Sequence, residues 1–225
     1  PYGDNWSNEH KTQEMISEWM RVYYAMTTNL DWNFGKLISS IKNAGIINNT
    51  IIIFTSDHGE MFGSHGRMKK NIFYEESIRV PFLIQYRDIL SSGLKLDTLL
   101  STVDIMPTIL GLVDVEIPKE VEGTDLSLAL RRKTIDEPLF AFLMNTGACA
   151  IWEDGHEWRA IRDKKYTYAV YRGSKDLPRK ELFFNNINDP FQLNNLIDNS
   201  KYLTKINRFR SFLINKMNQL KDEFP

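Results

Sequence analysis

The chain has 225 residues, of which 42% are hydrophobic, and its formal net charge is -1. This composition is that of a globular protein with one large domain or two small ones. The 28 basic and 29 acidic residues nearly balance, which argues against nucleic-acid binding through a broad basic surface. The one cysteine, Cys149, excludes an internal disulfide, and the sequence lacks the run of about 18 apolar residues that a membrane span needs.

The first predicted element is a long helix that follows a polar loop over residues 1–13. From Glu14 to about Ala44, apolar residues recur at intervals of three and four, which places them in one stripe along a helix. We expect the aromatic residues of this stripe to belong to the core, and Gly45 to end the helix. Because the chain begins at Pro1 with a polar stretch and no Met, we interpret it as a piece from the middle of a longer protein.

A continuous apolar run, Ile51 to Phe54, follows the helix. Such a density of β-branched and aromatic residues predicts a strand buried on both faces, as in a parallel sheet. Asp57 and His58 come shortly after this run, at the position where open α/β sheets bind ligands. A carboxylate and a neutral imidazole are both ligand types for a divalent cation, which needs more than two ligands.

The loop after His58 is polar, contains several glycines, and carries His65 and then Lys69 and Lys70. Two positive charges ~4 Å apart repel by about 4 kcal/mol at an effective dielectric near 20, so a lysine beside a metal needs an anion between them. The loop therefore indicates a metal and a lysine that bind one anionic group. Taken singly, an Asp-His pair after a strand is more often a turn or a helix cap, and two adjacent lysines are more often surface. The combination favours the site.

This stretch resembles the sulfatases, a branch of the alkaline-phosphatase superfamily, in the order and spacing of its residues. The matching residues are Thr55-Ser56-Asp57-His58-Gly59, His65-Gly66, Lys70, Phe73-Tyr74-Glu75 and Arg79-Val80-Pro81. The resemblance implies that Asp57 and His58 bind a divalent metal, most often Ca²⁺ in this family. It also implies that Lys70 contacts the sulfate ester and that His65 lies near the substrate, so both are candidate catalytic residues.

The charged residues after Lys70 have a structural interpretation. Glu75, Glu76 and Arg79 are expected to orient the loop and its exit into a strand predicted for residues 80–85. Farther along, Asp104 is interpreted as a helix N-cap, with Pro107 in the first turn of that helix.

After Pro138 the pattern changes to short strands separated by turn residues, which predicts an antiparallel sheet. The expected strands are Leu139–Met144, Ala148–Trp152, Trp158–Arg162, Tyr166–Tyr171 and Glu181–Phe184. A final helix is predicted over about 199–222. The fold class is therefore α/β: part of an alkaline-phosphatase-like sheet with flanking helices over residues 1–137, then an α+β subdomain over 138–225. In this subdomain a small antiparallel sheet packs on a C-terminal helix.

The second part resembles the C-terminal subdomain of sulfatases. The resemblance implies that His156 and Arg159 contact the substrate beyond its sulfate. The alternative is an exposed turn at His156 and a packed indole at Trp158.

The residues that a sulfatase uses as its nucleophile are not found in this sequence. In that family the nucleophile is a formylglycine made from Cys or Ser in C/S-x-P-x-R, but Cys149 is followed by Ala-Ile-Trp-Glu and no Ser-x-Pro-x-Arg occurs. The paired N-terminal aspartates of the family, which are further metal ligands, have no counterpart before Asp57. We therefore expect the nucleophile in the N-terminal half of the same protein, with this chain alone inactive and its Ca²⁺ site incomplete.

These observations predict a fragment of a sulfuric ester hydrolase that acts on the sulfate monoester of a small molecule or glycan. One alternative is a phosphate- or phosphonate-ester hydrolase of the same superfamily, and another is a non-catalytic binding domain that kept the fold. A sheet edge left open by the missing half is expected to promote self-association of the fragment.

Overall fold

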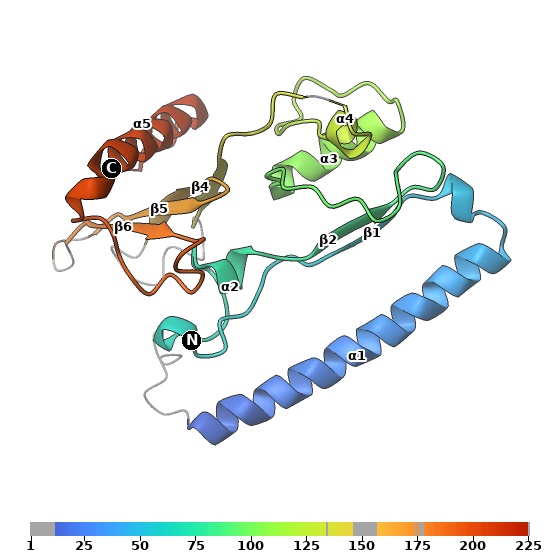
Figure 1. The fold of residues 1–225 in the computed structure, drawn as a ribbon, viewed down its shortest axis with the longest axis horizontal. Helices are drawn as coiled ribbons and strands as arrows, with labels where there is room; N and C mark the ends of the chain where they lie inside the picture. The colour runs from blue at the N-terminus through green and yellow to red at the C-terminus, as the bar shows by residue number, and fades with distance from the viewer. Residues whose placement is uncertain (1–11, 134, 146–156, 174, 176–177, 225) are drawn as a thin grey trace. The chain divides into compact units, whose positions relative to one another are not determined.

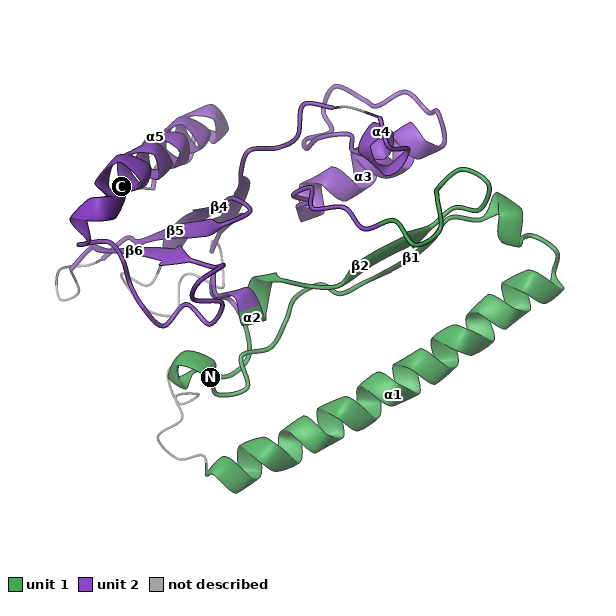
Figure 2. Cartoon of the chain, viewed as in Figure 1, with its two compact units in different colours: residues 1–70, 76–94 green, residues 71–75, 95–225 purple. Residues whose placement is uncertain are grey.

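The computed structural model describes residues 12–133, 135–145, 157–173, 175 and 178–224, and Figure 1 shows the helices and strands of the chain. The chain divides into two compact units (Figure 2). The first comprises residues 1–70 and 76–94, and the second comprises residues 71–75 and 95–225. The short segment 71–75 thus belongs to the second unit, although its neighbours in sequence on both sides belong to the first. The division into domains at residues 1–137 and 138–225 stays a prediction.

The long N-terminal helix forms where the sequence predicts it. Helix α1 (Gln13–Asn43) begins after Thr12, whose side chain accepts a hydrogen bond from the N–H of Met15 at 3.3 Å. It ends at Asn43, and Gly45 follows the C-cap residue Ala44; Gly45 has φ +71°, and its N–H donates to the carbonyl of Lys42 at 3.0 Å. Within the described residues, no helix is long and apolar enough to cross a membrane.

The prediction that the aromatic residues of α1 belong to the core is wrong for this chain. None of its residues is buried, and Tyr24 and Trp32 are among those that are exposed. The rings of Phe34 and Phe54 contact each other at 5.3 Å between centroids. The physical reason is a mismatch of length: a helix of 31 residues extends about 46 Å, whereas a strand of four residues extends about 13 Å.

The short 3₁₀ helix η2 (Ile47–Asn49) leads into strand β1 (Ile52–Thr55), which pairs with β2 (Phe82–Gln85). The two strands run antiparallel, with Ile52 opposite Gln85, so the expectation of a parallel neighbour for β1 is wrong for this pair. The connection between them contains the short helices η3 (Ser64–Gly66) and α2 (Glu75–Ile78) instead of the long crossover helix that usually joins parallel strands. Of the four residues of β1, Ile52 alone is buried, so burial on both faces is also wrong.

Helices α3 (Thr102–Leu112) and α4 (Ser127–Leu130) follow in the second unit. The N-cap of α3 is Ser101, so the prediction of Asp104 as N-cap is wrong. Asp104 lies inside the first turn, where its buried carboxylate accepts hydrogen bonds from the N–H groups of Ser101 and Thr124, both at 2.7 Å. Pro107 lies beyond the first turn, in the interior of the helix.

The C-terminal part is an antiparallel sheet followed by a helix, as predicted, and four of the five predicted strands form the sheet among the described residues. The strands, in spatial order, are β3 (Ala141–Met144), β4 (Trp158–Arg162), β5 (Tyr166–Tyr171) and β6 (Lys180–Asn185). After the short η5 (Ser200–Tyr202), helix α5 (Leu203–Leu220) buries Ile206, Phe209, Leu213 and Met217 at intervals of three and four. These side chains join Ile161, Tyr168, Val170, Phe183 and Phe224 in one hydrophobic core. The strand predicted over 148–152 lies outside the described residues.

The observed elements confirm the α/β fold class and the small antiparallel sheet packed on a C-terminal helix.

Candidate functional site

The residues predicted to bind metal lie directly beyond β1 and contact each other. The Nε2 atom of His58 lies 3.2 Å from Oδ2 of Asp57, and the Nδ1 atom of His58 lies 2.7 Å from the carbonyl oxygen of Gly59. The backbone N–H of His58 donates to Oδ1 of Asp57 at 2.9 Å and lowers the pKa of that carboxyl, which is fully ionised at neutral pH. The Asp57 side chain is 81% exposed, whereas that of His58 is 35% exposed.

A close backbone contact with α2 restrains the residue that follows this pair, Gly59. The N–H of Gly59 donates to the carbonyl of Ser77 at 2.7 Å. A Cβ atom at position 59 would lie 1.9 Å from the carbonyl oxygen of Glu76, far inside van der Waals contact. Glycine is therefore required beside His58, because the backbone of α2 passes too close for any side chain.

The loop from Glu60 to Lys69 closes on itself. The N–H of Met61 donates to the carbonyl of Lys69 at 2.8 Å, and the side chain of Met61 is buried. The carboxylate of Glu60 accepts a hydrogen bond from the N–H of Lys69. His65 lies on this loop in η3 with φ +55°, and Lys70 follows the loop as an exposed residue.

The structure thus places the side chains of Asp57 and His58 in contact, with His65 on the loop that follows them and Lys70 directly after that loop, in the same compact unit. By donor type, a carboxylate and an imidazole suit a divalent cation. Two ligands do not complete a cation site, since Ca²⁺ takes 6–8 oxygen ligands. Within the described part of the chain, no group of three or more His, Cys, Asp or Glu side chains is gathered as a cation site. The roles of all four residues stay predictions.

Arg159, a predicted substrate-binding residue, is buried in β4. Its guanidinium makes a bidentate ion pair with the carboxylate of Asp222, with 2.9 Å between Nη2 and Oδ1. Its Nη1 atom donates to the carbonyl oxygens of Asn145 and Trp158, both at 3.0 Å. This geometry gives Arg159 a structural role, and its contact with a substrate stays a prediction. His156, the other predicted substrate-binding residue, lies outside the described residues.

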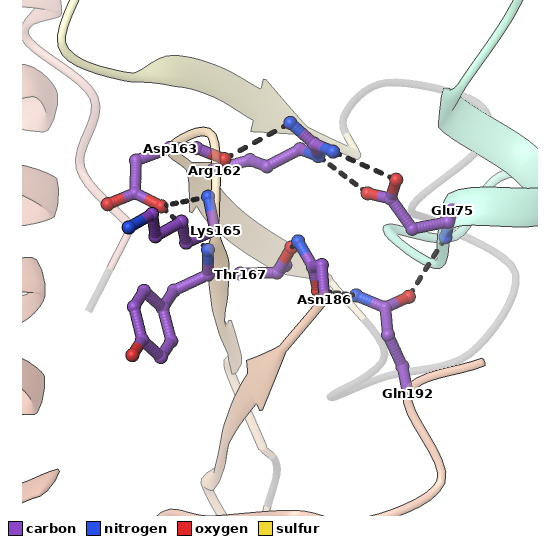
Figure 3. Close-up of polar contacts among 8 residues, drawn as sticks. Glu75, Arg162, Asp163, Lys165, Thr167, Asn186 and Gln192 are labelled. Atoms are coloured by element: carbon purple, nitrogen blue, oxygen red, sulfur yellow. Dashed lines mark hydrogen bonds and ion pairs between the residues drawn. The ribbon is translucent and has the colours of Figure 1, made fainter. Parts of the chain in front are cut away.

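A buried polar network, which the sequence does not reveal, surrounds Glu75, five residues after Lys70 (Figure 3). The carboxylate of Glu75 forms a bidentate ion pair with Arg162, and the N–H of Glu75 donates to Oε1 of Gln192 at 2.9 Å. The amide of Gln192 donates in turn to Oδ1 of Asn186 at 3.1 Å. Glu75 therefore has the structural role expected of it. Gln192 has no local signal, since it is a polar residue in a polar loop.

Comparison with known proteins places this chain in a family. The family model described as "Sulfatase" matches residues 1–115, and the model "N-sulphoglucosamine sulphohydrolase, C-terminal" matches residues 63–222. The ulvan-active sulfatase of Formosa agariphila is 37% identical over 217 residues, which cover 95% of this chain and 42% of that protein.

Two solved structures have a similar fold. One is a protein in complex with its substrate D-glucosamine-2-N,6-O-disulfate, with a TM-score of 0.85 and 26% identity, over 97% of this chain and 45% of that one. The other is the phosphonate monoester hydrolase of Agrobacterium radiobacter, with a TM-score of 0.81 and 25% identity, over 93% of this chain and 43% of that one. The chain spans less than half the length of each of these relatives. On the two family models and this sequence identity, the chain belongs to the sulfatase family.

Proposed function

We propose that this chain is the C-terminal part of a metal-dependent sulfatase, which hydrolyses sulfate monoesters through a formylglycine outside the chain. The observation that carries this proposal is the contact between Asp57 and His58 at the end of β1, in a chain of the sulfatase family. The loop that follows supplies His65 and Lys70 at the spacing of the family motif.

Asp57 and His58 would hold a divalent cation, for which Ca²⁺ is our candidate, together with ligands from outside this chain. When bound, such a cation supplies Lewis-acid polarisation of the sulfate oxygens. The ionised state of Asp57 favours this role, since its lowered pKa keeps the carboxylate charged at neutral pH.

Lys70 and His65 would act on the sulfate ester itself. In hydrolysis the oxygen of the nucleophile forms a bond to sulfur while the ester S–O bond breaks, so negative charge grows on the sulfate and leaving oxygens. A fixed ammonium group such as that of Lys70 stabilises this charge without reorganisation during the reaction. His65 would contribute to the same stabilisation from the loop before it.

The substrate class that we propose is a sulfated glycan or a sulfated small molecule. Support comes from the relatives: one is described as ulvan-active, and another binds a disulfated glucosamine. The formal net charge of -1 is consistent with recognition of a local sulfate group by a few residues rather than by a broad basic surface.

A phosphonate- or phosphate-ester hydrolase of the same superfamily is the second candidate, and the likeness to the phosphonate monoester hydrolase favours it. A non-catalytic binding domain is the third. The reading frame upstream of Pro1 distinguishes them. An in-frame C/S-x-P-x-R supports the sulfatase, a plain Thr or Ser as nucleophile supports the phosphate- or phosphonate-ester hydrolase, and a start codon near Pro1 supports the binding domain.

The test compares hydrolysis of an aryl sulfate and an aryl phosphonate by the longer protein encoded by that reading frame. We expect the sulfate to be preferred, and Lys70→Gln to lower kcat by about 10²–10³, the usual loss when one charge-stabilising group is removed. Lys69→Gln, which removes the neighbouring charge, is the matched control and should change kcat by less than about threefold. The 225-residue chain alone should show no turnover. Absence of sulfate-ester hydrolysis by the longer protein, or an equal effect of the two lysine variants, would contradict the proposal.

A further inference from the structure

The residues directly after Lys70 are held by the C-terminal sheet. Segment 71–75 belongs to the same compact unit as β3–β6 and α5. The indole N–H of Trp158 donates to the carbonyl oxygen of Asn71 at 3.1 Å. The ring of Phe73 is fully buried and contacts the rings of Trp158 and Tyr171, at 5.3 Å and 5.6 Å between centroids.

The far end of the segment is fixed by the network in Figure 3. The Nη2 atom of Arg162 lies 2.9 Å from Oε2 of Glu75, and Nε of the same guanidinium contacts the other carboxylate oxygen. Gln192 is 1% exposed and accepts from the N–H of Glu75, and it donates to Asn186, whose amide donates to Thr167 at 2.9 Å. Both side chains of the ion pair are largely buried, so their geometry is restrained by packing as well as by charge.

The backbone on either side of Lys70 requires such a restraint. Lys69 has φ +67° and Asn71 has φ +72°, both in the left-handed region, which lysine seldom adopts and asparagine adopts more readily. Strained backbone persists only where the surrounding contacts fix it. Before Lys70 the restraint is the carboxylate of Glu60 on the N–H of Lys69, and after Lys70 it is the indole of Trp158 on the carbonyl of Asn71.

We propose that Arg162 and Trp158 are positioning residues for Lys70. Trp158 holds the carbonyl of Asn71 at the start of segment 71–75, and Arg162 holds the carboxylate of Glu75 at its end. By fixing the segment, they would set the direction in which the side chain of Lys70 leaves the backbone, through the covalent chain rather than by contact with the ammonium group. This inference rests on the proposed role of Lys70 in sulfate-ester hydrolysis. It gives the C-terminal sheet a part in catalysis that does not depend on a contact with the substrate.

A double-mutant cycle in the longer protein tests the inference. Arg162→Met should lower kcat by about tenfold to a hundredfold, since displacement of a catalytic group by about 1 Å has effects of this size. In the Lys70→Gln background, the same Arg162→Met change should lower kcat by less than about twofold, because the group that it positions is gone. Additive effects of the two substitutions would overturn the inference. An independent loss of folded protein would reduce the rate equally in both backgrounds.

The matched control is Arg210→Met, which breaks the ion pair between Arg210 of α5 and Glu181 of β6. The Nη2 atom of Arg210 lies 2.6 Å from Oε2 of Glu181, and no residue of segment 71–75 takes part in that pair. Arg210→Met should change kcat by less than about twofold at a temperature where all variants are folded. A loss equal to that of Arg162→Met would overturn the inference, because it would show that any broken ion pair has this effect.

If Arg162→Met does not fold, Trp158→Phe takes its place, because phenylalanine keeps an aromatic ring against Phe73 but lacks the N–H that binds Asn71. We expect about a threefold to tenfold loss of kcat, again absent in the Lys70→Gln background.

Hydrogen exchange on the 225-residue chain separates this inference from the proposed function, because it needs no activity. Arg162→Met should speed amide exchange across residues 70–75 by at least about tenfold relative to Arg210→Met, as expected when a local restraint is lost. Equal exchange in the two variants would overturn the inference even if the longer protein is a sulfatase. If Lys70→Gln leaves hydrolysis unchanged while the exchange difference is found, the proposed function fails instead, and the restraint on the segment stands.

Discussion

The two helices of greatest length in the described chain carry the same kind of apolar stripe but have opposite surroundings. Helix α5 buries its stripe against the four-stranded sheet, and together they form a core around Phe183 and Phe209. Helix α1 has no buried residue, and much of its stripe faces outward. The candidate catalytic residues thus belong to the unit with the smaller core, whereas the segment that follows Lys70 belongs to the unit with the larger one.

Removal of a large side chain from the core of the second unit should have the greatest effect on stability. Phe209 is 1% exposed, and its ring contacts those of Phe140, Tyr166 and Phe183. Phe209→Ala should lower the free energy of unfolding by about 3–5 kcal/mol, because it removes buried apolar surface and leaves a cavity. Urea unfolding monitored by circular dichroism measures this change. A loss no larger than that of Met26→Ala, on the exposed side of α1, would show that the two helices do not differ as described.

The ion pair between Arg159 and Asp222 should contribute somewhat less to the free energy of unfolding than Phe209 does, and its contribution should depend on pH. The hydrogen bonds from Arg159 lower the pKa of the Asp222 carboxyl from its ordinary value of 3.8. The charged form is therefore favoured by folding, and its stabilisation is present above about pH 4 and is lost as the pH falls through the lowered pKa. Asp222→Asn should cost about 1.5–3 kcal/mol at pH 7, the range for hydrogen bonds to charged groups.

The control for that prediction is Asp198→Asn, which changes an exposed carboxylate and should have an effect within about 0.5 kcal/mol. The difference in unfolding free energy between the native chain and Asp222→Asn should stay constant from pH 7 to pH 5 and shrink below about pH 4. A difference that grows as the pH falls would contradict the direction of the pKa shift.

Two glycines of the first unit provide a comparison inside that unit. Gly59 has the carbonyl oxygen of Glu76 at 1.9 Å from the position of an added Cβ, whereas Gly35 in α1 has nothing within 4 Å. Gly59→Ala should destabilise by about 1–3 kcal/mol because the backbone of α2 has to move. Gly35→Ala should stabilise by about 0.5–1 kcal/mol, since alanine is the better helix former. Thermal unfolding of both variants checks the signs, and two changes of the same sign would contradict the close contact at Gly59.

Local sequence patterns predicted the elements well, because their signals are local. The spacing of apolar residues located α1 and α5, and Gly45, which adopts positive φ, lies two residues after the end of α1 at Asn43. The density of β-branched residues found β1, but it could not show which strand would pair with it or in which direction. The prediction that α1 is buried was wrong, because periodicity identifies the apolar face of a helix but not the surface that covers it.

The candidate site also contains residues that local sequence predicts and residues that it does not. Asp57, His58, His65 and Lys70 could be proposed from the sequence because they lie within one short stretch, and their roles stay predictions. The residues that restrain its last part could not, because Arg162 and Gln192 lie 87 and 117 positions from Glu75. The partner of Arg159 could not be predicted either, because Asp222 lies 63 positions away; the ion pair gives Arg159 a structural role, and its contact with a substrate stays a prediction.

The smallest effect on stability should come from a substitution on the exposed face of α1, and the same substitution of a buried leucine in α5 provides the comparison. Leu30 is 59% exposed and Leu213 is 2% exposed. Leu213→Gln places an amide in the core and should destabilise the chain by several kcal/mol, whereas Leu30→Gln should change stability by less than about 0.5 kcal/mol. Leu30→Gln should also reduce any self-association of the chain, since exposed apolar side chains favour contact between copies. Sedimentation velocity at several concentrations measures this, and a large loss of stability with Leu30→Gln would mean that α1 is covered within this chain after all.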